Sequence, residues 1–268
     1  MFYLLLFRLL KRPSFYVSLA IGAVLATAYF WTEEMPLTEH LELTGGVSFT
    51  PYTKWMGIGG ISDYPALYMF LLPILATLPL SDLYARDRST GFIRFLMIRG
   101  KHTQYFFSLF FINFLAGVLT AIFPLLLNIY LSFMKLPNIR PDRAINNEMP
   151  LASDNTFFPE LYYTHPFVHM MLYVIIIGIF SGMFASIALG AGMFIKRSFI
   201  VLLIPFASLY IINMLLSTIG HQEMISTSFL QEQATDGVSL KSLILHLIVG
   251  FILGLLLYIL GAKKNVVR

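Results

Sequence analysis

The stretch FVHMMLYVIIIGIFSGMFASIALGAGMFI, residues 167–195, decides the fold class because it contains no Asp, Glu, Lys or Arg. It is longer than the roughly 20 apolar residues with which a helix crosses about 30 Å of hydrocarbon. Five further stretches are also predominantly apolar, although the second is short. The chain is therefore predicted to form six membrane-spanning helices, over residues 14–31, 66–81, 105–133, 167–195, 199–219 and 240–262. We expect an all-α, polytopic membrane protein.

The composition of the whole chain agrees with that fold class. Of its 268 residues, 57% are hydrophobic and only 12% are charged, with a mean hydropathy of +0.76. Soluble chains carry about twice this share of charged residues. Because the chain has no Cys, a disulfide framework, a thiolate nucleophile and a Cys-ligated metal are excluded. Without an internal repeat or a linker, residues 1–268 are expected to form a single transmembrane domain.

The basic residues have a strongly sided distribution. The N-terminus, the loop 82–104, the turn 196–197 and the C-terminus hold three, five, two and three of the 18 Lys and Arg residues. The remaining loops, 32–65, 134–166 and 220–239, hold most of the acids. The positive-inside rule then places both termini in the cytoplasm of a multi-pass cell-membrane protein and requires an even number of spans. This pattern explains the net charge of +4 by membrane orientation, so no nucleic-acid partner is expected.

The first 13 residues are predicted to form an interfacial helix before the first span. Arg8, Lys11 and Arg12 recur at helical spacing beside apolar residues, which is typical of a helix that lies along the membrane surface. Pro13 then interrupts the helix. A simple extension of the first span is the alternative interpretation.

The spans show little sign of catalytic or ion-coupling chemistry. Their predicted interiors hold no Asp, Glu, Lys or Arg, which argues against an ion-coupled carrier. The chain has no GxxxxGK[ST] phosphate loop and cannot be a P-loop ATPase by itself. An intramembrane protease would need Ser181 or Ser186 close to His246, but their predicted depths in the membrane differ. The small residues of the fourth span instead predict a close-packing helix face, at Gly178, Gly182, Ser186 and Gly190.

Two groups of residues that include histidine are candidate metal ligands. His40 lies beside Glu39 and Glu42, and His165 precedes His169 by one helical turn. Neither group has the H-E-x-x-H spacing of a helical zinc site, and Pro166 interrupts the second. We therefore predict no metal and no cofactor bound by this chain.

The loop between the second and third predicted spans carries the most informative sequence, DLYARDRSTGFIRFLMIRGK at residues 82–101. Ser89 or Thr90 can cap a helix, and Gly100 can end it. In between, Phe92, Phe95, Leu96 and Arg99 follow the i, i+3, i+4, i+7 pattern of one helix face. The pattern fits a helix at the membrane interface, and it fits equally a docking helix for a soluble partner.

This loop resembles the coupling loop of the membrane subunits of ABC-2-type ATP-binding cassette exporters. In that family an acidic residue and Arg, a Gly-Thr or similar pair, a hydrophobic helix and a basic residue follow one another. Here those places are taken by Asp87-Arg88, Thr90-Gly91, residues 92–98, and Arg99 or Lys101. The family commonly has two short re-entrant helices between its fifth and sixth spans, and the polar segment 220–239 fits that pattern weakly.

The resemblance implies that this chain is not itself an enzyme but the permease half of an exporter. The coupling helix would press into a separate ATP-binding cassette ATPase subunit, which binds ATP and Mg. A second permease copy or a paralogue would complete the translocation path for an amphipathic peptide, antibiotic or lipid-like substrate. The residues expected to form the coupling site are Asp87, Arg88, Gly91, Phe92, Arg94, Phe95 and Arg99. The alternatives are a non-transporting scaffold or sensor that docks a cytoplasmic partner, and an intramembrane enzyme.

Overall fold

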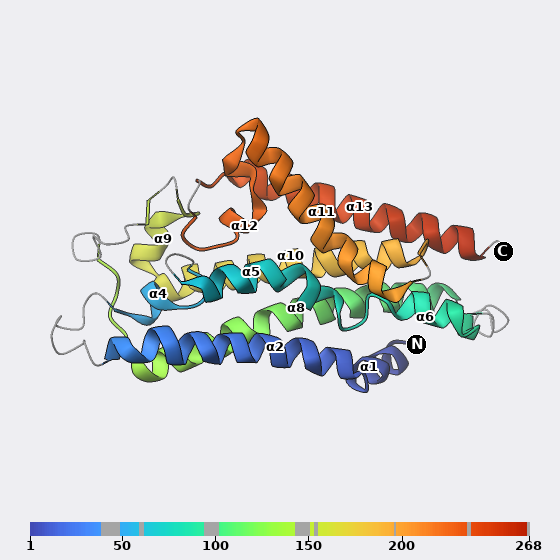
Figure 1. Cartoon of the computed structure of the whole chain (residues 1–268), viewed down its shortest axis with the longest axis horizontal. Coiled ribbons are helices and arrows are strands. Elements are labelled where there is room, and N and C mark those ends of the chain that lie inside the picture. Colours follow the sequence, from blue (N-terminus) through green and yellow to red (C-terminus); the bar gives the residue numbers. More distant parts are fainter. Residues whose placement is uncertain are drawn as a thin grey trace.

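The computed structural model describes residues 1–38, 49–58, 62–93, 102–142, 151–152, 155–195, 197–234 and 237–266. The described residues form helices and irregular segments and contain no strand. The helices are α1 Phe2–Leu10, α2 Pro13–Tyr29, η1 Phe30–Glu34, α4 Pro51–Lys54, α5 Asp63–Thr77, α6 Leu83–Ser89, α8 His102–Lys135, α9 Pro159–Thr164, α10 Pro166–Gly192, α11 Ser198–Ile219, η2 Gln222–Met224, α12 Ser226–Phe229 and α13 Leu240–Val266. The longer helices run roughly side by side, and both chain termini lie at the same end of the bundle, here called the terminal end (Figure 1).

Within the described residues, five helices are long and apolar enough to cross a membrane. They cover Pro13–Thr38, Thr103–Lys135, Pro166–Gly192, Ser198–Ile219 and Leu240–Lys264. Helix α5 occupies the place of the predicted second span but has only 15 residues and contains Pro73. These helices define an all-α membrane protein. The first spanning helix is longer than predicted, because α2 continues through the wider turn of η1 as far as Thr38.

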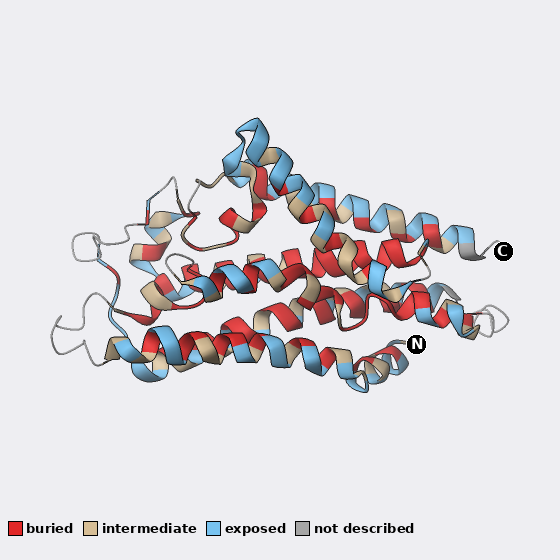
Figure 2. Cartoon of the chain, viewed as in Figure 1, coloured by how far each residue is buried: buried red, intermediate tan, exposed pale blue. Residues whose placement is uncertain are grey.

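Helix α10, the stretch that decided the fold class, lies in the middle of the bundle and is the most buried of the five (Figure 2). It packs against α5, α8, α11 and α13. The predicted small residues lie at these contacts. A Cβ atom added to Gly178 would meet Ile122, and one added to Gly182 would meet Phe114. Helix α13 approaches so closely that a Cβ on Gly190 would lie 3.0 Å from the Gly254 carbonyl oxygen, and Gly254 itself faces Ser186.

Helices α11 and α13 expose large apolar side chains over much of their length. Phe199 and Met214 of α11 are 72% and 74% exposed, and Leu256 of α13 is 52% exposed. Apolar surface of this extent is costly in water and is the expected surface of helices that face lipid.

The N-terminal helix α1 is a separate element, as the sequence predicts. Arg12 has an extended backbone, and Pro13 supplies the first residue of α2, where a proline costs no hydrogen bond. Leu5 and Leu9 of α1 are buried, and the helix packs on α8. Its other face exposes the apolar side chains of Phe2, Tyr3, Leu4, Phe7 and Leu10. Helix α1 therefore carries apolar side chains both against the bundle and on its exposed face.

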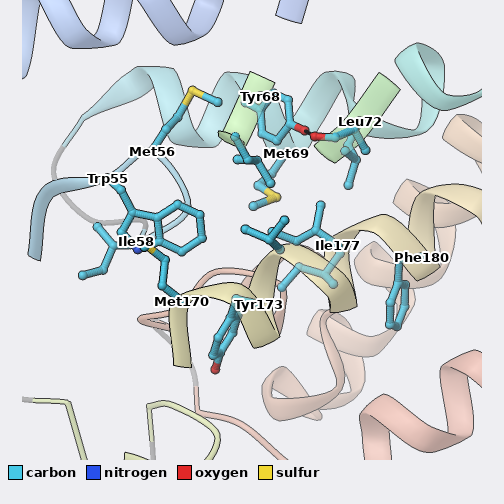
Figure 3. Packing of buried hydrophobic residues seen from close by; sticks show 14 of the residues in the cluster. Trp55, Met56, Ile58, Tyr68, Met69, Leu72, Met170, Tyr173, Ile177 and Phe180 are labelled. Atoms are coloured by element: carbon cyan, nitrogen blue, oxygen red, sulfur yellow. Dashed lines mark hydrogen bonds between the residues drawn. The ribbon is translucent and has the colours of Figure 1, made fainter. Parts of the chain in front are cut away.

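The end of the bundle opposite the termini is filled by segments that were predicted as loops. Trp55, which follows α4, points into the space between α5 and α10, and Met56 lies beside α5 (Figure 3). There they belong to one apolar cluster with Tyr68 of α5 and Tyr173 of α10. The Tyr68 hydroxyl donates a hydrogen bond to the Ala121 carbonyl of α8 at 2.5 Å. The connections at this end thus form part of the core.

Candidate functional site

Helix α6 occupies the start of the loop that was predicted to dock a partner, at the terminal end of the bundle (Figure 1). The sequence predicted Ser89 or Thr90 as the N-cap of a helix. Instead both residues lie at the C-terminus of α6, where the Thr90 amide donates to the Arg86 carbonyl at 3.0 Å. Gly91 follows with φ of +77°, the left-handed conformation that glycine adopts most readily after a helix. Helix α6 is thus a helix upstream of Gly91 that was not predicted from the sequence, and residues 94–100 of the predicted docking helix lie outside the described residues.

The carboxylate of Asp87 joins three helices. Arg8 of α1 donates to it twice, with 2.8 Å from Nη1 to Oδ2 and 2.5 Å from Nη2 to Oδ1. The Tyr105 hydroxyl of α8 donates to Oδ2 at 2.6 Å. Asp87 is only 2% exposed, so these hydrogen bonds replace the water that would otherwise solvate its carboxylate. The hydrogen bonds from Arg8 to Asp87 raise the pKa of the Arg8 guanidinium above its ordinary value. Arg8, Asp87 and Tyr105 are called the Asp87 cluster below.

A second carboxylate, Asp82, ties the junction of α1 and α2 to the start of α6. Its oxygens lie 2.8 Å from Arg12 Nη2 and 2.5 Å from Arg86 Nε. Arg12 also donates to the Pro79 carbonyl at 3.2 Å. Both acids of the loop thus bind basic residues that the sequence had assigned to the interfacial helix or to the loop.

Arg88 connects α6 to the central helix. Its Nη1 atom donates to the carbonyl oxygen of Met193, which is the C-cap residue of α10, at 3.1 Å. A cation is favoured at this position because the carbonyls of the last helical turn lack partners within the helix. Nearby, burial raises the pKa of the Tyr84 hydroxyl to about 12.

The structure brings together only part of the predicted coupling site. Asp87 and Arg88 are engaged within the chain, and Gly91 forms the turn. The ring of Phe92 lies 5.1 Å from the Arg8 guanidinium carbon, and the Lys11 amine lies 4.4 Å from the ring of Phe7. The rest of the site, comprising Arg94, Phe95 and Arg99, lies outside the described residues.

The opposite end of the bundle contains a polar cluster that sequence reasoning missed. Glu232, from the segment between α12 and α13, lies 2.5 Å through Oε1 from His169 Nδ1 of α10. Trp55 Nε1 donates to Oε2 of the same carboxyl group. Both His169 and Glu232 are 0% exposed. They are 63 positions apart, and no local spacing in the sequence links them. Trp55, His169 and Glu232 are called the Glu232 cluster below.

The Glu232 cluster holds a shared proton. His169 Nε2 lies 2.7 Å from the Phe157 carbonyl oxygen, which only accepts, so Nε2 carries a proton. A second proton must then lie between Nδ1 and Oε1, since otherwise two lone pairs would face each other across 2.5 Å. Burial raises the pKa of Glu232, which favours retention of that proton.

Glu34 corrects the expectation that no acid lies within a span. The first spanning helix reaches Thr38, so it includes Glu34, which is 1% exposed. Asn128 of α8 donates to Glu34 Oε1 at 2.8 Å, and its own amide oxygen accepts from the Met56 amide at 2.7 Å. A buried acid in a membrane helix is thereby connected to the segment after α4.

The other candidate chemistries do not come together within the described residues. Ser181 and Ser186 donate to carbonyls of their own helix, at 2.8 Å and 2.9 Å, and His246 Nδ1 bonds to the Ser242 carbonyl of its own helix. Among the described residues no group of three or more His, Asp or Glu side chains is arranged to hold a metal ion. The possible ligands Glu39, His40 and Glu42 lie outside the described part of the chain.

Comparison with known proteins assigns the chain to no family. No protein-family model matches it, and no curated protein or solved structure matches it either.

Proposed function

We propose that the chain is the permease half of an ATP-driven exporter that couples to a separate ATPase subunit through the loop 82–104. The observation that supports this proposal is that α6 is attached to three other helices. This helix begins that loop, and it is bonded to α1 through Asp87, to α8 through Tyr105 and to α10 through Arg88. A displacement of the residues after Gly91 would therefore be transmitted to the bundle, because α6 is bonded to three of its helices.

The proposal includes six spans with both termini in the cytoplasm. Helix α5 would be the second of these six spans, lengthened by the turn that follows Thr77. The common position of the two termini supports an even number of crossings (Figure 1). The sided distribution of Lys and Arg supports a cytoplasmic position for the terminal end.

In the proposed mechanism the partner binds ATP and supplies the energy. Its closure would move the loop, and with it α6, and thereby bias the bundle between two arrangements. A second permease copy or a paralogue would border the path. The exposed apolar surfaces of α11 and α13 fit an amphipathic or lipid-like substrate better than a small ion.

Affinity purification from native membranes tests this proposal. The tagged chain should retain an ATPase subunit, and reversal of Arg94 to Glu should reduce both that retention and ATP turnover several-fold. The matched control is Lys241→Glu, which reverses a charge at the opposite end of the bundle and should retain the ATPase. Purification of the chain without an ATPase would refute the exporter.

A scaffold or sensor is an alternative to the exporter, since it would use the same loop. It predicts a partner whose own activity does not depend on ATP. Identification of the retained protein by mass spectrometry, followed by an ATP-turnover assay, separates the two functions.

A further inference from the structure

A cavity of about 410 Å³ lies between the N-terminal helix and α6 at the terminal end. One side is formed by Arg8, Lys11 and Arg12, and the other by Leu83, Arg86 and Asp87. The cavity lies beside the Asp87 cluster, so its walls are held in place by the pairs Arg8–Asp87 and Arg12–Asp82.

The cavity has an excess of positive charge. Four basic side chains line it, whereas Asp82 and Asp87 supply the two carboxylates that pair with them. Asp82 is shared between Arg12 and Arg86, and the Arg86 side chain is 60% exposed. Two positive charges are therefore uncompensated by these acids, which favours an anionic ligand.

Apolar side chains at the cavity favour an anionic ligand that also has an apolar part. Phe7 lines the cavity itself, and Leu83 lies on the other wall. From Phe7 the surface of α1 continues over the exposed side chains of Tyr3, Leu4 and Leu10. A free phosphate would pair with the basic side chains but leave this apolar face exposed, whereas the acyl chains of a lipid would also cover the face.

We propose that this cavity binds the phosphate headgroup of an anionic phospholipid, with the acyl chains along the exposed face of α1. Lys11 and Arg86 contact the phosphate, and Arg8 and Arg12 keep their carboxylate partners. The bound lipid then joins α1 to α6 in addition to the existing ion pairs. The site does not depend on an ATPase partner or on the direction of transport.

Native mass spectrometry of the purified full-length chain with equal amounts of phosphatidylglycerol and phosphatidylcholine tests the proposal. The unaltered chain should retain phosphatidylglycerol preferentially. Lys11→Gln together with Arg86→Gln should lower that preference, by about fivefold for each removed charge. The matched control is Lys263→Gln with Lys264→Gln, which removes two charges from the last turn of α13.

Three outcomes would overturn the lipid site. The first is equal retention of phosphatidylglycerol by the unaltered chain and the Lys11/Arg86 variant. The second is an equal loss in the Lys263/Lys264 control, which would indicate diffuse attraction to a basic surface. The third is full displacement of the lipid by millimolar glycerol phosphate, which would show that the acyl chains contribute nothing. If the double variant does not fold, the single variants Lys11→Gln and Arg86→Gln give the same comparison.

Discussion

Arg8 and Asp87 lie 79 positions apart and form a two-point ion pair that joins the N-terminal helix to α6. The two parallel contacts fix the relative orientation of the guanidinium and carboxylate planes, which a Lys ammonium could not do. The Asp87 side chain is 3% exposed and that of Arg8 is 30% exposed. The pair therefore has a buried acid and a partly hydrated base. Loss of the pair should cost more free energy at Asp87, which water cannot reach, than at Arg8.

Asp87→Asn should destabilise the chain by about 1.5–3 kcal/mol, because it removes the charge that accepts three hydrogen bonds. The cost should stay below that of a fully buried ion pair because Arg8 is partly hydrated. Thermal unfolding in detergent measures the effect. Arg86→Gln is the control, since Arg86 is 60% exposed and Asp82 keeps its pair with Arg12, so the loss should be no more than about 1 kcal/mol. A loss for Asp87→Asn no larger than that of the control would contradict the assigned role.

Tyr105→Phe tests whether the Asp87 cluster acts as one unit. Loss of the hydroxyl that donates to Asp87 Oδ2 should cost about 1 kcal/mol. In the Asp87→Asn background the same substitution should cost clearly less, because the two residues share an interaction. The four unfolding free energies of this double-mutant cycle supply the coupling. Strict additivity would mean that Tyr105 and Asp87 contribute independently.

The sequence predicts the features that depend on local pattern. The apolar stretches locate the long helices, Pro13 separates α1 from α2, and Gly91 marks a turn. The small residues of the fourth predicted span lie at close helix contacts. Each of these features depends on the properties of a short segment, such as its hydropathy or its allowed backbone angles.

The features that the sequence did not predict depend on tertiary pairing. Asp87 reads as a loop acid available to a partner, and its burial against Arg8 becomes visible only when α1 folds back beside α6. In the same way, Glu232 reads as a solvated acid of a polar loop. Its burial requires that the segment 229–234 enter the bundle, where the Glu232 amide donates to the Gly57 carbonyl at 2.9 Å. Hydropathy contains no information on such contacts.

Gly190→Ala should destabilise the bundle by about 1–3 kcal/mol, because the added methyl group would lie 2.8 Å from Leu257 Cβ and 3.0 Å from a backbone oxygen of α13. Gly192, two residues further along α10, is the matched control. An added Cβ there meets its nearest neighbour at 3.4 Å, a side-chain atom of Val201. Gly192→Ala should be neutral or slightly stabilising. Thermal unfolding of both variants checks the prediction, and equal melting temperatures would exclude the close approach of α10 and α13.

Glu232 should make the stability of the chain depend on pH. Burial raises the pKa of this carboxyl group above the ordinary value of about 4.3, so the folded chain holds the proton more tightly than the unfolded chain. The stability contributed by this proton is fully present below about pH 4.3 and is lost as the pH rises toward the folded pKa. Loss of the shared proton leaves a carboxylate oxygen facing an unprotonated nitrogen at 2.5 Å.

Glu232→Gln separates this effect from the simple loss of a side chain. The Gln amide donates to His169 Nδ1 and accepts from Trp55 Nε1, so both hydrogen bonds persist without a titrating proton. The unaltered chain should lose thermal stability as the pH rises, and the variant should show a flatter profile. Glu223→Gln, an exposed acid in the same segment, should keep the original slope.

Fluorescence of Trp55 supplies a local readout of the same event. The chain has two tryptophans, so Trp31→Phe, at a position that is 64% exposed, leaves Trp55 as the sole reporter. Because the Trp55 indole donates to the titrating carboxyl group, its emission should change with pH over the range in which stability falls. The change should be absent in Glu232→Gln. A pH-dependent emission that persists in that variant would assign the titration to another group and remove Glu232 from the explanation.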